Sequence, residues 1–334
     1  MNKKQIVDLF LDNKSAERVP VAFWSHFVSF HDHHRGVSDE GVLKNVYEGQ
    51  KKFYEMYKPD FLKIMSDGFF GHPAMVERTF HSVEDLKKIE SCGRKHPFIT
   101  KQIEYVKEIC DYVDGEVYTF YNIFSPLQYI RLKIEEYDED FEIFSKLFVE
   151  SPEEMVGAAS RIAEDILILV DEIFSKTRVD GIYYSVQSVQ HKKADHEFHK
   201  AYVEPLDRLI LNEILKYTDK VILHVCGYAH YTNDLTWYKD YPVKAFNWAV
   251  FTENIGLAEG KKLLNGKPVL GGFDNNPESI LYSANMDEYK KYIYEILDQA
   301  GTNGIAIGAD CTVSNDFTPE RYQDIIQVVS DYKR

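Results

Sequence analysis

Short apolar runs rich in β-branched and aromatic residues alternate with longer segments of helical pattern along the chain. We interpret eight of these runs as buried strands, because each is bounded by residues typical of turns. They are residues 19–24, 61–66, 117–122, 179–186, 220–226, 243–248, 268–273 and 304–310. Strands that alternate with helices predict an α/β fold, and eight such units favour a closed (β/α)8 barrel, or TIM barrel. An open doubly wound sheet would also alternate, but its Gly-x-Gly-x-x-Gly turn does not follow the first run.

Three of the helical segments begin with residues that commonly start helices. The sequence Ser38-Asp39-Glu40 predicts a helix that runs to about Tyr57, and Ser151-Pro152 and Thr318-Pro319 predict two more. A further helical pattern precedes the first predicted strand. No stretch rich in Pro, Gly or Ser separates two halves of the sequence, so we expect residues 1–334 to form a single domain with an N-terminal helical extension.

The charge balance narrows the range of functions. The chain has 39 basic and 54 acidic side chains, which gives a formal net charge of −15. Because such a surface repels phosphate backbones, we expect no nucleic-acid partner. No apolar run has the length of a signal peptide or a membrane span, so we expect a cytoplasmic protein with no membrane partner. Four cysteines in a chain of 334 residues do not indicate a disulfide scaffold.

Polar side chains occupy nearly every predicted strand end, whereas the strand interiors are mostly aliphatic or aromatic. In TIM barrels the catalytic side chains lie at the C-terminal ends of the strands, so this contrast indicates an enzyme. We select Asp67, at the second strand end, as a candidate catalytic residue. The candidate substrate-binding residues are Trp24, His26, Asn122, Tyr184, Gln187 and Asp274. Each of these also has a structural interpretation as a hydrogen-bond or capping partner.

Two residues of the strand 220–226 have the chemistry of metal ligands. Residues two apart in a strand share a face, so His224 and Cys226 point the same way, toward the predicted barrel mouth. Cys311 follows the last strand and can meet them there. One nitrogen and two sulfurs are a ligand set typical of zinc with an open fourth position. A buried cysteine is often only a small apolar filler, so spacing alone leaves both interpretations open.

The run His31, Asp32, His33 and His34 also contains ligand-type side chains. It precedes the helix that Ser38 is expected to open. Such a run is more often a solvated loop before a helix than a second metal site, and its role stays open here.

The segment ILHVCG, followed far downstream by GADCTVSNDFTPERY, resembles the uroporphyrinogen decarboxylase superfamily. More narrowly, it is similar to the zinc-dependent methyltransferases of that superfamily, which transfer a methyl group from a corrinoid to a thiol such as coenzyme M. The residues that carry this resemblance are His224, Cys226, Gly227, Cys311 and Thr318-Pro319. Further matches are Arg18-Val19-Pro20-Val21, Asp67 and the stretch 271–275, so the resemblance spans about residues 5–332.

The resemblance implies that His224, Cys226 and Cys311 bind Zn²⁺ and take part in catalysis, with a methyl-corrinoid as co-substrate and a small-molecule thiol as acceptor. It also implies a corrinoid carrier protein as a partner and a homodimer. Coordination to zinc would deprotonate the thiol at neutral pH and make it nucleophilic. The expected function is therefore methyl transfer to a zinc-activated thiol.

Two other functions stay open. The decarboxylases of the superfamily act on a tetrapyrrole that bears many carboxylates, and they place arginines just after the first strand. This sequence has Ser25 and His26 there, with Arg35 as the nearest full cation, although Asp67 matches their catalytic aspartate. A lyase that acts on a carboxylated tetrapyrrole is thus one alternative. A barrel that binds a corrinoid or another small ligand without turnover is the other.

Overall fold

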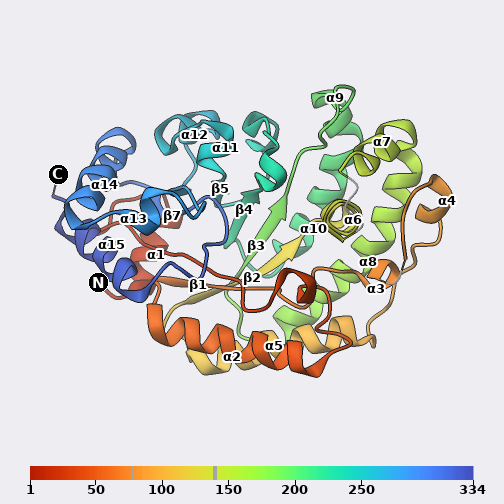
Figure 1. Ribbon diagram of the computed structural model, residues 1–334, viewed down its shortest axis with the longest axis horizontal. Coiled ribbons are helices and arrows are strands. Elements are labelled where there is room, and N and C mark those ends of the chain that lie inside the picture. Colours follow the sequence, from red (N-terminus) through yellow and green to blue (C-terminus); the bar gives the residue numbers. More distant parts are fainter. Residues whose placement is uncertain (77, 138–140, 334) are drawn as a thin grey trace.

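The computed structural model describes residues 1–76, 78–137 and 141–333. Seven parallel strands form one curled sheet, and helices lie around its outside (Figure 1). The strands are β1 (Phe61–Ile64), β2 (Tyr118–Phe124), β3 (Gly181–Val186), β4 (Val221–Val225), β5 (Ala245–Trp248), β6 (Val269–Phe273) and β7 (Ile305–Ala309). Their order in the sheet follows their order in the chain. This arrangement is consistent with a TIM-like fold.

Seven of the eight predicted strands are confirmed, but residues 19–24 do not form a regular strand. This segment makes an isolated bridge from Val21 to Ile307, and the Val21 N–H donates to the carboxylate of Asp60 at 2.7 Å. Pro20 has no N–H, so two successive residues cannot donate to a neighbouring strand. The prediction of a closed eight-stranded barrel was therefore wrong for the described residues, which form a curled seven-stranded sheet.

Helices of very different length cover the outer face of the sheet (Figure 1). They are α1 (Lys3–Leu11), α2 (Glu40–Tyr57), α3 (Pro73–Val76), α4 (Val83–Leu86), α5 (Pro97–Val113), α6 (Pro126–Arg131), α7 (Ile143–Glu150), α8 (Pro152–Lys176), α9 (His196–Phe198), α10 (Glu204–Ile214), α11 (Val250–Glu253), α12 (Leu257–Leu263), α13 (Ile280–Ser283), α14 (Met286–Ala300) and α15 (Pro319–Asp331). Single turns of 3-10 helix are η1 (Phe30–Asp32), η4 (Tyr228–His230) and η5 (Leu235–Tyr238), and π-helical turns are η2 (Leu132–Tyr137) and η3 (His199–Val203).

The three predicted helix starts are confirmed. The Asp39 carboxylate accepts hydrogen bonds from the first free N–H groups of α2, and Pro152 occupies the first turn of α8. At the start of α15, the Thr318 hydroxyl accepts from the Arg321 N–H. Each contact satisfies or avoids a backbone donor that has no partner within its helix.

Apolar side chains fill two regions, one between the sheet and its helices and a smaller one inside the curl of the sheet. The N-terminal helix α1 contributes Val7, Phe10 and Leu11 to the inner region, where they pack with residues near the starts of the strands, such as Phe61 and Phe120. The predicted N-terminal helical extension thus closes the amino end of the curled sheet. A pocket remains at the carboxyl end.

Candidate functional site

The pocket at the carboxyl ends of the strands has a volume of about 490 Å³. Its walls combine aromatic and aliphatic side chains with a few polar ones, which is typical of small-molecule sites. The polar residues that line it include His26, His33, Lys63, Asn122, Ser185, His224, Cys226 and Cys311. Five of these come directly from β1 to β4 or their ends, as the position of sites in TIM-like folds predicts.

His224, Cys226 and Cys311 lie together in this pocket. One ligand atom from each residue lies within 4.8 Å of the others, and the Cys311 sulfur is 3.7 Å from the Nε2 atom of His224. Two ligands of a tetrahedral zinc ion, with Zn–S of about 2.3 Å and Zn–N of about 2.1 Å, are separated by about 3.6 Å. The three side chains therefore have the donor chemistry and the spacing of a three-ligand zinc site.

Asn247, on the neighbouring strand β5, fixes the orientation of His224. The Asn247 amide nitrogen donates to the main-chain oxygens of Leu270 and Ala309, at 2.9 and 3.1 Å. Because both partners only accept, the amide oxygen must face His224, and it accepts from the His224 Nδ1–H at 2.6 Å. Nε2 consequently carries the free lone pair and faces Cys311. This is the tautomer that a metal ligand requires.

The two cysteines of this group influence each other's protonation. A hydrogen bond from Cys226 lowers the pKa of the Cys311 thiol, although burial opposes it. The contact with Cys311 and burial raise the pKa of Cys226. Of the two cysteines, Cys311 is therefore the one that loses its proton more easily.

Lys63, in β1, is a pocket residue that the sequence analysis missed. Its side chain is buried and lines the pocket, and its Nζ atom lies 3.9 Å from the ring centre of Tyr183 and 4.8 Å from that of Trp24. Among the described residues, no carboxylate forms an ion pair with it. Burial lowers the pKa of Lys63 to about 8, although negative charge on the sulfurs of Cys311 and Cys226 opposes this shift. One sequence feature could have identified it: Lys63 is the lone charged residue within the predicted strand 61–66.

Asp67 and His26 form a hydrogen-bonded pair at the same end of the sheet. The Asp67 carboxylate is fully buried and accepts from His26 Nδ1 at 2.8 Å and from the Phe27 N–H at 2.7 Å. Burial alone would lower the pKa of His26, but the Asp67 charge outweighs it and raises that pKa. Burial alone would likewise raise the pKa of Asp67, and His26 lowers it instead. His26 lines the pocket, and Asp67 holds it in place.

Asn122 lies in the pocket wall, where Ser66 and Ser185 hold its amide. Its nitrogen donates to the Ser66 hydroxyl at 2.8 Å, and its oxygen accepts from the Ser185 hydroxyl at 3.1 Å. Trp24 lies deeper, inside the curl of the sheet, with its ring 5.1 Å from that of Tyr183. It supports the pocket floor through Lys63 and Tyr183 and does not line the pocket itself.

Tyr184 lies outside the pocket, in contrast to the sequence-based selection. Its hydroxyl donates to the buried carboxylate of Asp207, in α10, at 3.0 Å. The adjacent Tyr183 is the tyrosine that faces the interior, where its hydroxyl donates to Asn247 at 2.6 Å. Asp274 also lies away from the pocket lining, and its carboxylate accepts from the N–H of Asn276 at 2.9 Å. Both residues have structural contacts that account for them.

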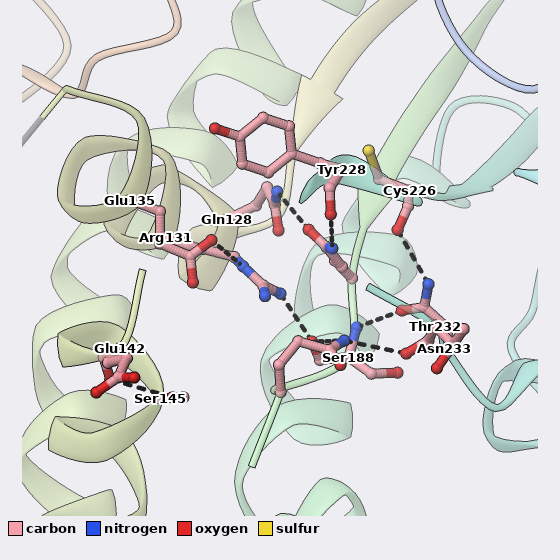
Figure 2. Close-up of polar contacts among 12 residues, drawn as sticks. Gln128, Arg131, Glu135, Glu142, Ser145, Ser188, Cys226, Tyr228, Thr232 and Asn233 are labelled. Atoms are coloured by element: carbon pink, nitrogen blue, oxygen red, sulfur yellow. Dashed lines mark hydrogen bonds and ion pairs between the residues drawn. The ribbon is translucent and has the colours of Figure 1, made fainter. Parts of the chain in front are cut away.

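Gln187 supports the loop that follows Cys226. Its side-chain nitrogen donates to the main-chain oxygen of Tyr228 at 3.0 Å. Asn233 donates to the Cys226 oxygen at 3.0 Å and accepts from the Ser188 N–H at 2.8 Å (Figure 2). These contacts attach the loop to the end of β3. The position of Cys226 is thus fixed from both sides.

The fold and the grouped side chains define a TIM-like α/β protein with a candidate metal centre. No protein-family profile matches this sequence, and no curated protein matches it. Among solved structures, a methyltransferase from Methanosarcina mazei is similar over 99% of both chains, with 12% identity and a TM-score of 0.73.

Two further similar structures are B12-independent methionine synthases. The putative enzyme from Listeria monocytogenes shares 11% identity, with 96% of this chain and 99% of that chain covered and a TM-score of 0.53. The enzyme from Shewanella sp. W3-18-1, solved with selenomethionine, shares 11% identity over 93% of each chain, with a TM-score of 0.54. Identities this low establish a likeness of fold. Within the part of the chain that the structure describes, no helix is long and apolar enough to cross a membrane.

Proposed function

We propose that this protein is a zinc-dependent methyltransferase of the uroporphyrinogen decarboxylase superfamily, which moves a methyl group from a methyl-corrinoid to a small-molecule thiol. The observation that carries the proposal is the group of His224, Cys226 and Cys311, which line one pocket together. Two sulfurs and one nitrogen suit zinc, and the pocket leaves room for a fourth ligand. The likeness of fold to a methyltransferase and to two methionine synthases supports it further.

Bound zinc would lower the pKa of an incoming thiol and so supply a thiolate at neutral pH. The chain's own residues would prepare that site. His224 would ligate through Nε2, because Asn247 holds its Nδ1–H, and Cys226 and Cys311 would ligate as thiolates. Lys63 would place a positive charge near these thiolates and offset part of their negative charge.

The lining of the pocket weighs against decarboxylation of a tetrapyrrole. Among the described residues that line it, there is no arginine to bind a substrate with many carboxylates. Methyl transfer does not need such arginines. A carrier protein for the corrinoid, a homodimer and a cytoplasmic location belong to the same proposal.

Zinc analysis and methyl transfer test the proposal together. Purified protein should contain close to one equivalent of zinc at the thiolate site and should demethylate methylcobalamin when suitable thiols are added. Cys311→Ser should lose both properties. Cys110→Ala, in the core-facing side of α5, provides the matched control and should retain both.

A protein that lacks zinc at this site, or a Cys311→Ser variant with full zinc and full transfer, would overturn the proposal. Binding of methylcobalamin without any demethylation would favour a non-catalytic binding protein.

A further inference from the structure

A second group of ligand-type side chains lies in the same pocket. His26, His33 and Asp67 each place one ligand atom within 4.8 Å of the others. Both histidines line the pocket, and the carboxylate lies directly behind His26. None of the three belongs to the group of His224, Cys226 and Cys311.

His33 is the residue of this group with a ring nitrogen that lacks a partner. It is only 5% exposed, and the Val28 main chain makes the one hydrogen-bond contact of its ring, a weak one. The ring is packed against His26 and Phe70, with ring centres 4.2 and 4.7 Å away. A buried imidazole nitrogen without a partner costs free energy, and proteins rarely retain one. A metal ion would be the missing partner of one nitrogen.

The donor atoms of the group also suit a metal ion. Two imidazole nitrogens and one carboxylate oxygen form a set that binds divalent first-row transition metals.

Main-chain contacts hold the two loops of this group together. The Gly36 N–H donates to the Gly68 oxygen at 2.9 Å, and the Phe70 N–H donates to the His33 oxygen at 2.9 Å. A Cβ atom at Gly36 would lie 2.9 Å from the Gly68 Cα atom, so the approach depends on glycine. The loop that carries His33 is therefore fixed against the loop that carries Asp67, and the ligand atoms are brought together before any ion binds.

A third group, His72, Cys92 and Asp165, shows what a purely structural arrangement looks like. There the Asp165 carboxylate accepts four hydrogen bonds, from the His72 ring, the Ser91 hydroxyl and the N–H groups of Cys92 and Gly93. His72 also accepts from the Ala74 N–H. No polar atom of that group awaits a partner, so it carries no metal proposal.

We propose that His26, His33 and Asp67 bind a second divalent transition-metal ion, separate from the ion at His224, Cys226 and Cys311. Three protein ligands leave coordination positions open, and the two histidines face the pocket. An oxygen donor of the bound small molecule, such as a carboxylate, can take one of these positions. This proposal stands on its own residues and does not depend on the methyltransferase proposal.

The test is metal stoichiometry in the full chain, measured by mass spectrometry of the metals after chelation, reloading with Co²⁺ and desalting. Wild-type protein should bind two ions per chain, and the double variant Cys226→Ser/Cys311→Ser should bind one. In that double variant the thiolate-to-cobalt absorption should be lost while the weaker ligand-field bands of a nitrogen–oxygen site remain. Adding His33→Phe, or the more conservative Asp67→Asn, should remove the remaining ion. Adding His31→Ala, an exposed neighbour in the same run, should leave it.

Two results would overturn the proposal: a double variant that binds no cobalt, or one whose ion persists after both His33→Phe and Asp67→Asn. Far-ultraviolet circular dichroism of each variant confirms that it is folded before its stoichiometry is compared. Wild-type protein that binds one ion with no thiolate-to-cobalt absorption would support this second site and overturn the methyltransferase proposal instead. The failures of the two proposals are thus distinguishable.

Discussion

Replacing Lys63 with methionine should stabilise the protein and impair its activity at the same time. Methionine has a similar length and fills the same space, but it removes the ammonium group. Lys63 is buried beside the rings of Tyr183 and Trp24 and has no ion-pair partner among the described residues. A charge at this position therefore lowers the stability of the folded protein. Residues that serve a ligand often carry such a cost in stability.

The size of the effect follows from the pKa. Burial lowers the pKa of Lys63 from its ordinary 10.5 to about 8. At pH 7 this difference corresponds to a destabilisation of about 3 kcal/mol. Attraction to the two aromatic rings offsets about 1 to 2 kcal/mol of it. The Lys63→Met variant should therefore gain about 1 to 2 kcal/mol in its free energy of unfolding at pH 7.

The depressed pKa also determines how the stability of the protein changes with pH. Because the folded-state pKa is depressed, the unfolded chain binds more protons between about pH 8 and 10.5, and the stability of the wild type rises over this range. The advantage of the variant should accordingly shrink to below about 1 kcal/mol by pH 10.

Urea unfolding of metal-free, reduced protein at pH 7 and pH 10 measures this change. Lys44→Met is the matched control, because Lys44 is exposed, and it should stay within about 0.5 kcal/mol of the wild type. In the methyl-transfer assay we expect kcat/KM of Lys63→Met to fall by about tenfold or more, which corresponds to about 1.4 kcal/mol. A variant that is less stable than the wild type at pH 7, or one with unchanged kcat/KM, would refute the reasoning.

Three further predictions concern residues outside the group of His224, Cys226 and Cys311. Tyr184→Phe should lower the free energy of unfolding in urea by about 1 to 3 kcal/mol, because buried Asp207 loses a donor, and should leave metal content unchanged. Burial raises the pKa of Asp207 to about 7, so its contribution to the free energy of unfolding falls by about 4 kcal/mol as the pH rises from about 4 to 7. Urea unfolding of Asp207→Asn over this pH range should lack this decrease. Gly36→Ala should reduce cobalt binding in the Cys226→Ser/Cys311→Ser background, because its Cβ atom pushes against Gly68; unchanged binding would contradict the loop argument.

The strand pattern was sufficient to locate the thiolate group. His224 and Cys226 are two residues apart, so a strand alone places them on one face. The parallel strands of β4 and β7 then bring Cys311 to the same end of the sheet. Neither step needs knowledge of side-chain packing. The role of the group in metal binding stays a prediction.

The choice between Tyr183 and Tyr184 needed more than the sequence. Every residue of β3 is buried, so apolar side chains occupy both faces and no alternation indicates the inner one. Lys63 was missed for a related reason: it lies within β1 and not at the strand end, where sites in such folds are expected. Its long side chain reaches the pocket from there.

Two other features that the sequence did not predict depend on tertiary contacts between distant segments of the chain. The segment 19–24 has the composition of a strand, but the Asp60 carboxylate takes the Val21 N–H that a ladder would use. In the histidine run, main-chain bonds from the loop after β1 decide that His33 is buried while His31 is exposed. Such pairings between distant segments leave no periodic trace in the sequence.

The helix α1 has a kinetic consequence. Within the described residues, Val7, Phe10 and Leu11 cover the amino end of the curled sheet, and the pocket lies at the carboxyl end, where we expect ligands to enter. A small methyl acceptor and a bulky methyl donor would then use the same entrance to the pocket. The small partner has to enter before the large one covers the opening, and it leaves only after the large one departs. Steady-state kinetics should therefore follow a compulsory order, with the donor analogue trapping the acceptor inside.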